Sequence, residues 1–160
     1  YHYYGIDKVR LEGKEVLFVA GEVGLLMRST DGAKSWEMLP SPYEGTFFGI
    51  AAGSNALLAF GLGGEAYLSD DLGDSWQPVE KSGVNNQAVS GALPLSDGNF
   101  VMSTNNGILY RLKKADTKAS RLSVKVPGSM AIAETGDGNL VVAGVMGIKR
   151  ISMTDNKSEQ

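Results

Sequence analysis

The chain has 160 residues, of which 21 are glycine and none is cysteine, and its formal net charge is −3. A mildly acidic chain lacks the basic patches that mark nucleic-acid-binding proteins, and without cysteine there are neither disulfides nor thiolate metal sites. No apolar run approaches the roughly 18 residues that a membrane-spanning helix needs. The composition therefore predicts no nucleic-acid partner and no spanning segment, and its many glycines favour a fold rich in tight turns.

A glycine that ends a tight turn after an apolar segment recurs four times, at Gly24, Gly64, Gly107 and Gly147, with spacings of 40, 43 and 40 residues. A second marker, Asp-Gly-Asn, starts at Asp97 and again at Asp137. Asp-Gly between two apolar runs is a strong signal for a β-hairpin. Repeats of this length with four short strands each are typical of β-propellers.

In the second repeat we expect strands over residues 47–52, 56–60, 65–69 and 77–80, the first of them nearest the propeller axis. The predicted fold is all-β, a β-propeller fragment of about four four-stranded blades. The predicted blades cover residues 1–41, 42–82, 83–127 and 128–152, the last one incomplete, and residues 153–160 form a polar tail.

One eight-residue pattern occurs twice, at residues 29–36 and 69–76, with Ser, Asp, Ser and Trp at matching positions. An aspartate in such a turn accepts hydrogen bonds from backbone amides of its own turn, and glycine allows a positive φ. The tryptophan that closes the turn buries a large apolar surface. We therefore expect Trp36 and Trp76 to be largely buried between adjacent blades.

The third repeat lacks this pattern, because residues 112–120 contain three lysines and no tryptophan. We expect a longer, solvated hairpin tip there. The acidic run at residues 70–74 lacks the ligand spacing and distal glutamate of a calcium loop, so a turn satisfied by its own hydrogen bonds is favoured over a metal site, and no cofactor is predicted. His2, the single histidine, stands at the start of the chain, which argues against a Ser-His-Asp triad.

The repeated pattern resembles the Asp-box, Ser-x-Asp-x-Gly-x-x-Trp, of BNR-type repeats, which lies between the two outer strands of a propeller blade. The second copy matches in full, with Ser69, Asp71, Gly73 and Trp76. The first copy matches with Ser29, Asp31 and Trp36 but has Ala33 in place of the glycine. Asp-boxes also occur in sialidases and some glucanases, so a carbohydrate-active enzyme stays as the alternative. The sequence lacks the Arg-Ile-Pro segment of sialidases, and the boxes argue for a fold rather than an activity.

The whole repeat resembles the photosystem II assembly/stability-factor-like propellers. The matching segments are Val19-Ala20-Gly21-Glu22-Val23-Gly24 and Met27-Arg28-Ser29-Thr30-Asp31-Gly32. This resemblance implies a seven-bladed, non-enzymatic scaffold that binds other proteins, usually membrane proteins, in an exported or periplasmic compartment. By the same resemblance, the chain corresponds to the C-terminal part of such a propeller.

Two sets of loops share one end of a propeller: those joining each blade to the next, and those joining the second strand of a blade to the third. Aromatic residues and methionine are enriched in the centres of protein interfaces. We therefore expect a protein or peptide partner at this end. The candidate residues there are Pro42, Tyr43, Phe47, Phe48, Leu62, Val145 and Met146.

Two pairs of candidate residues have an alternative interpretation. In the alternative for Phe47 and Phe48, these residues begin an inner strand, with one ring turned to the core. Arg28 and Arg111 each stand four residues after a repeat glycine. They either form a basic stripe for an acidic tail or cover a neighbouring blade with their stems.

Four blades of a larger propeller leave two sheet faces uncovered. Exposed apolar area forfeits about 25 cal/mol per Å², and residues 148–152 also offer an unpaired edge. We expect these faces to be covered by the remaining blades of a propeller or by a second copy of the chain.

Overall fold

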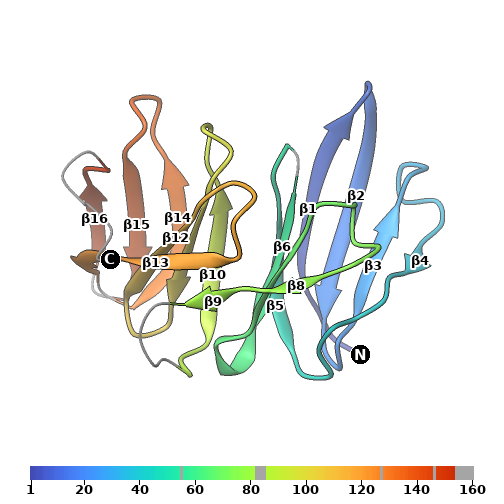
Figure 1. The fold of residues 1–160 in the computed structure, drawn as a ribbon, viewed down its shortest axis with the longest axis horizontal. Helices are drawn as coiled ribbons and strands as arrows, with labels where there is room; N and C mark the ends of the chain where they lie inside the picture. The colour runs from blue at the N-terminus through green and yellow to red at the C-terminus, as the bar shows by residue number, and fades with distance from the viewer. Residues whose placement is uncertain (55, 82–85, 127, 146, 154–160) are drawn as a thin grey trace.

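The computed structural model describes residues 1–153 except residues 55, 82–85, 127 and 146. These residues form four β-sheets arranged side by side (Figure 1). The first sheet contains β1 (Tyr3–Leu11), β2 (Lys14–Gly21), β3 (Leu26–Ser29) and β4 (Glu37–Met38). The second contains β5 (Phe47–Ala52), β6 (Leu57–Gly61), β7 (Ala66–Ser69) and β8 (Gln77–Pro78), with the 3₁₀ turn η1 (Leu62–Gly64) between β6 and β7.

The third sheet contains β10 (Val89–Pro94), β11 (Phe100–Thr104), β12 (Ile108–Leu112) and β13 (Lys118–Lys125), joined at its edge by β9 (Glu80–Lys81). The fourth contains β14 (Ser129–Glu134), β15 (Leu140–Gly144) and β16 (Gly147–Ile151). Within each sheet, consecutive strands pair antiparallel as a meander. The predicted all-β, partial propeller fold is confirmed.

Each inner strand has an irregularity in its pairing near its start, between Tyr3 and Gly5 in β1 and between Phe47 and Gly49 in β5. β10 and β14 repeat it at the matching place. A Cβ atom added to Gly5 would lie 2.6 Å from the Gly49 Cα atom. Glycine at this place therefore lets the first two inner strands approach closely.

The strand β9 departs from the predicted pattern. Residues 77–80 were expected to form one outer strand of the second blade, but β8 ends at Pro78. Residues Glu80–Lys81 instead pair in parallel with Lys118 and Ala119 of β13. The chain leaving the second sheet thus becomes an additional edge strand of the third.

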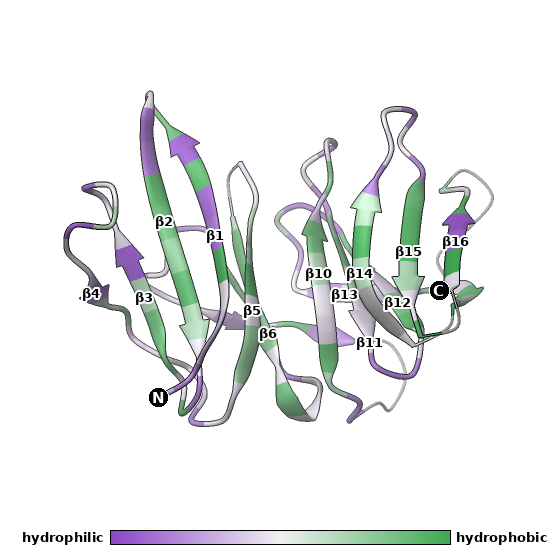
Figure 2. Cartoon of the chain, turned by 180° about the vertical axis from the view of Figure 1, so that it is seen from behind, coloured by the Kyte–Doolittle hydropathy of each residue, from purple (hydrophilic) through white to green (hydrophobic). Residues whose placement is uncertain are grey.

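Three apolar clusters fill the spaces between neighbouring sheets, one for each of the three interfaces. The second strands supply much of this core, and Figure 2 shows the hydrophobic colouring along β2 and β15. In the first cluster Phe18 and Leu26 of the first sheet meet Phe47 and Leu57 of the second, all at most 1% exposed. Burial of the second strands on both faces explains why their sequences are almost continuously apolar.

The outer face of the first sheet has no neighbour. Ile6 pairs with Val19 as Ile50 pairs with Ala59, so the two isoleucines hold equivalent positions in consecutive sheets. Ile50 is 5% exposed, whereas Ile6 is 65% exposed. The face that bears Ile6 is therefore a sheet-packing face that nothing covers in this structure.

Candidate functional site

Two turns carry the repeated Ser-Asp-Ser-Trp pattern, and both are held by their own aspartate. Asp31 Oδ1 accepts hydrogen bonds from the backbone amides of Lys34 and Ser35, both at 3.0 Å. Asp71 Oδ1 likewise accepts from the Ser75 amide at 2.8 Å, and the Ser75 hydroxyl donates to Oδ2 at 2.6 Å. The predicted self-satisfied turns are confirmed.

The serine that opens each turn completes this network. Ser69 Oγ donates to Asp71 at 2.8 Å and accepts from the Gly73 amide, also at 2.8 Å. Ser29 does the same with Asp31 and the Ala33 amide. Ala33 adopts a φ of +67°, in the same left-handed region as Gly73 at +95°, so the alanine keeps the turn with local backbone strain.

These hydrogen bonds make the two turns sensitive to acid. The main cause is the second serine of each turn, Ser35 or Ser75, which donates from its hydroxyl and its amide to the aspartate. These hydrogen bonds lower the pKa of Asp31 and of Asp71 to about 2, from an ordinary 3.8. A carboxyl group with a depressed folded-state pKa contributes stability above its unfolded pKa and loses it as the pH falls through the folded value.

We expect the thermal unfolding midpoint to be steady from pH 7 to about pH 5 and to fall between about pH 4 and pH 2. Circular dichroism melts across this range measure it. The double variant D31N/D71N should melt lower at neutral pH and show a shallower acid dependence. An unchanged slope in that variant would assign the acid sensitivity to other carboxyl groups.

The two tryptophans of these turns have different surroundings. Trp76 packs against the cluster between the first and second sheets, where Leu39 lies next to Gly73. Trp36 lies on the uncovered face of the first sheet and lines a hollow of about 410 Å³ with Tyr3, Ile6 and Met27. Both indoles are half-buried, so the predicted burial is only partial at Trp76, and it is wrong for Trp36 because no sheet packs against that residue here.

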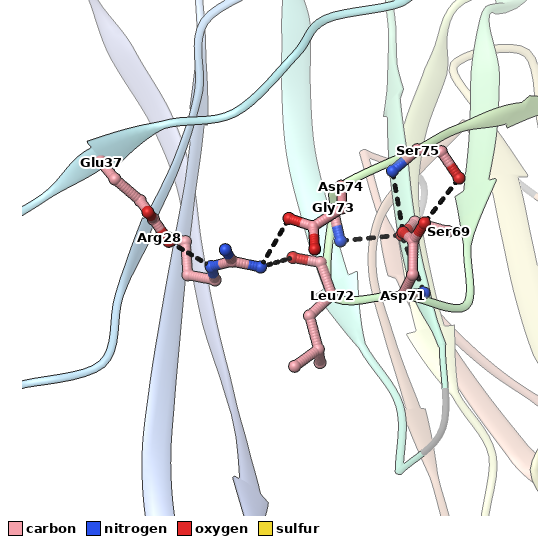
Figure 3. A network of polar contacts seen from close by, with 8 residues as sticks. All are labelled: Arg28, Glu37, Ser69, Asp71, Leu72, Gly73, Asp74 and Ser75. Atoms are coloured by element: carbon pink, nitrogen blue, oxygen red, sulfur yellow. Dashed lines mark hydrogen bonds and ion pairs between the residues drawn. The ribbon is translucent and has the colours of Figure 1, made fainter.

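Arg28 links the first two sheets (Figure 3). Its side chain extends from β3, is 16% exposed, and donates from Nη1 to the Leu72 carbonyl oxygen at 2.9 Å. It also forms ion pairs with Glu37 of its own sheet and, at 3.1 Å, with Asp74 of the second turn. Arg28 thus covers a neighbouring sheet, which was the alternative to a basic stripe.

Replacing Arg28 by methionine keeps the apolar stem but removes these polar contacts. We expect a loss of about 1–2 kcal/mol in the free energy of unfolding, since a partly buried charged donor is worth more than a surface ion pair. Arg150 is the matched control: its equivalent side chain is 59% exposed and pairs with Asp137. Chemical denaturation of R150M should show a change below about 0.5 kcal/mol. Equal losses in the two variants would contradict the role of Arg28 as a link.

Arg111, like Arg28, is paired within the blades rather than in the loops that were expected to bind a partner. It pairs at 2.6 Å with Asp97, in the hairpin between β10 and β11. Both arginines therefore lie away from the loops that were expected to bind a partner, and carboxylates of the same sheet or of its neighbour pair with them. The third hairpin tip, with Lys113 and Lys114, is exposed as expected.

The loops expected to share one end of the molecule are hydrogen-bonded to one another there. The Gly24 amide donates to the Gly45 carbonyl oxygen at 2.6 Å, and the Leu62 amide donates to the Thr46 carbonyl oxygen at 3.0 Å. The Tyr43 hydroxyl donates to the Leu62 carbonyl oxygen at 3.3 Å. The loop between the first two sheets therefore lies against the turns of both, at the lower edge of Figure 1 near η1 and the N terminus.

Apolar side chains project from equivalent turns at this end. Val23, Leu62 and Val145 follow the second strands of the first, second and fourth sheets and are 63%, 50% and 78% exposed. The third sheet has Asn105 and Asn106 at the same place, both exposed. We call this set of turns, with residues 39–46, the loop-end surface.

The predicted partner residues divide between this surface and the core. Leu62 and Val145 are exposed, Pro42 is exposed, and Tyr43 and Phe48 are half-buried. Phe47 is completely buried and packs edge-on against Tyr43 and Tyr67, so it cannot contact a partner. Met146 lies outside the described residues. Val23 was not singled out, although it directly precedes the first repeat glycine as Met146 precedes the fourth.

Elsewhere on the described part of the chain, no group of three or more His, Cys, Asp or Glu side chains is arranged to hold a metal ion. Within the same residues no helix is long and apolar enough to span a membrane.

Sequence comparison finds two curated relatives. The chain is 33% identical over 89 residues to the uncharacterized protein YkuO of Bacillus subtilis, covering 55% of this chain and 30% of that protein. It is 29% identical over 143 residues to the photosystem II assembly lipoprotein Ycf48 of a Synechococcus strain, covering 86% of this chain and 42% of that protein. The chain thus spans less than half the length of the curated relatives it matches. No family model matches the sequence.

Solved structures show the same fold. YCF48 from Cyanidioschyzon merolae superposes with a TM-score of 0.74 at 14% identity, covering 99% of this chain and 56% of that one. A structure described as YCF48 bound to D1 peptide superposes with a TM-score of 0.70 at 17% identity, covering 89% of this chain and 48% of that one. The WD40 propeller domain of Doa1 superposes with a TM-score of 0.70 at 13% identity, covering 98% of this chain and 52% of that domain. The chain is therefore a partial β-propeller, similar in sequence to a Ycf48 protein.

Proposed function

We propose that this chain is part of a non-catalytic propeller scaffold that binds a protein or peptide partner through the loop-end surface. The observation that carries the proposal is the repetition of exposed apolar side chains at equivalent turns, at Val23, Leu62 and Val145. Apolar side chains exposed at one end of a folded domain favour an interaction surface there. Tyr43 and Phe48 are proposed to contribute the half-buried base of this surface.

The similarity to Ycf48 supports a more specific role. One relative is called a photosystem II assembly lipoprotein, and a solved YCF48 is described as bound to a D1 peptide. We therefore propose that the chain acts as an assembly or accessory factor for a membrane protein complex, and that it works in an exported compartment. We also propose that the two turns are Asp-boxes. The hydrogen bonds from the Ser35 and Ser75 amides to Asp31 and Asp71 support this interpretation.

Affinity capture tests the proposal. The full chain, immobilised, is exposed to the detergent-solubilised membranes of the organism that encodes it, in parallel with the triple variant V23S/L62S/V145S. The wild type should retain a membrane protein about tenfold better than the triple variant, because a few central apolar side chains carry most of an interface's energy.

The variant I6S is the control, since this side chain is exposed on the uncovered face of the first sheet and lines a hollow away from the three loop-end side chains. It should retain the partner as the wild type does. Equal capture by the triple variant would contradict the proposed surface, and robust turnover of aryl glycosides by the wild type would overturn the non-catalytic assignment.

A further inference from the structure

The loop-end surface carries carboxylates in addition to its apolar side chains. Its described turns and connecting loops comprise residues 22–25, 39–46, 62–65, 86–88, 105–107, 126, 128 and 145. These residues include three glutamates, Glu22, Glu44 and Glu65, and neither lysine nor arginine. Two basic groups reach its edge: Lys81 Nζ donates to the Gly64 carbonyl oxygen, and His2 Nδ1 lies 2.8 Å from Glu22 Oε2. The surface therefore keeps an excess of negative charge.

The three carboxylates lie among the exposed apolar side chains. Glu22 directly precedes Val23, and Glu65 closes the turn that bears Leu62. Glu44 is exposed on the loop that is hydrogen-bonded to both turns. Carboxylate and apolar groups thus alternate over the first two sheets at this end.

Two of these carboxylates are oriented by tyrosine hydroxyl groups. The Tyr4 hydroxyl donates to Glu22 Oε1 at 3.1 Å, and the Tyr67 hydroxyl donates to Glu65 Oε2 at 2.7 Å. Burial, with this hydrogen bond and the charge of Glu65, raises the pKa of Tyr67 to about 12. The tyrosine therefore stays neutral and leaves the negative charge of Glu65 in place.

We infer that the partner segment bound at the loop-end surface combines apolar side chains with lysine or arginine; this inference rests on the proposed function. A cationic side chain at Glu44 or Glu65 gains a charge-assisted hydrogen bond. An acidic segment at the same place meets like charge, which costs affinity and slows association. The apolar turns supply the contact area, and the glutamates select the sign of the partner's charge.

A peptide array tests the inference with the full chain. Immobilised 12-residue peptides of varied sequence, balanced in lysine, arginine, aspartate and glutamate, are probed with the wild type and with V23S/L62S/V145S. Peptides that lose binding in the triple variant define loop-end ligands. These should be enriched in basic residues next to apolar ones. The best of them should bind at least about fivefold more tightly than twins in which glutamate replaces each basic residue.

The double variant E44Q/E65Q should weaken binding of the basic peptides about three- to tenfold and flatten their dependence on salt. The matched control E12Q/D70N removes two exposed carboxylates at the other end of the blades and should leave binding unchanged. Loop-end ligands without a basic preference, or an unchanged affinity in E44Q/E65Q, would overturn the inference while the proposed function stands. An array without any ligand that depends on the three apolar side chains would overturn both.

Discussion

Replacing Trp76 by alanine is expected to lower the free energy of unfolding by about 3 kcal/mol, whereas the same change at Trp36 should cost less than about 1 kcal/mol. The two residues close equivalent turns and differ in what packs against them. Trp76 is half-buried and packs against the cluster between the first two sheets, and Trp36 lies on a face without a neighbour in this structure. Urea unfolding of the two variants measures the difference.

Trp76→Phe is the control for this pair. It retains a six-membered aromatic ring and removes the five-membered ring of the indole, including an N–H that has no hydrogen-bond partner in the part of the chain that the structure describes. This variant should lose less than half as much stability as Trp76→Ala. Similar losses for the alanine variants at the two positions would show that the turns, rather than packing between the sheets, determine the contribution of each tryptophan.

Light scattering on the isolated chain is expected to give an average mass above that of one chain at micromolar concentration. The uncovered face of the first sheet carries Ile6 and Met38, which are 65% and 63% exposed. At the far end of the molecule Ile148, 78% exposed, stands on β16. Contiguous apolar faces of this kind drive association, since each Å² removed from water contributes about 25 cal/mol.

The double variant I6E/M38E should weaken this association at least about tenfold, because it would place two charges in the contact. Its far-ultraviolet circular dichroism should match that of the wild type, since both side chains already face solvent. A well-folded wild type that stays strictly monomeric would contradict the expectation that these faces need a cover.

The inner strands show how far the sequence determines the fold. The predicted strand over residues 47–52 coincides with β5, and the two strands after it begin one residue later than expected. Alternation could not show which of Phe47 and Phe48 turns inward, because the pairing irregularity between Phe47 and Gly49 interrupts the period of two. The structure buries Phe47 and leaves Phe48 half-buried.

The candidate site was predictable where it depends on a local turn. The aspartate turns follow from side chains that bond to their own backbone, so the sequence suffices. Burial of Trp36 was not predictable, because it depends on a surface beyond the first sheet. Val23 carries the same signal as Val145, an apolar residue within a glycine-bounded turn, and comparing all four turns would have found it.

The pairing of β9 with β13 has a mechanical consequence for the chain. The residues that leave the second sheet are fastened to the third, through the Glu80 amide and the Thr117 carbonyl oxygen at 2.8 Å as well as through the strand pair. Rotation of the second sheet against the third would have to break these backbone hydrogen bonds as well as separate the packed side chains. The strand pair therefore restrains how the second and third sheets can move relative to one another.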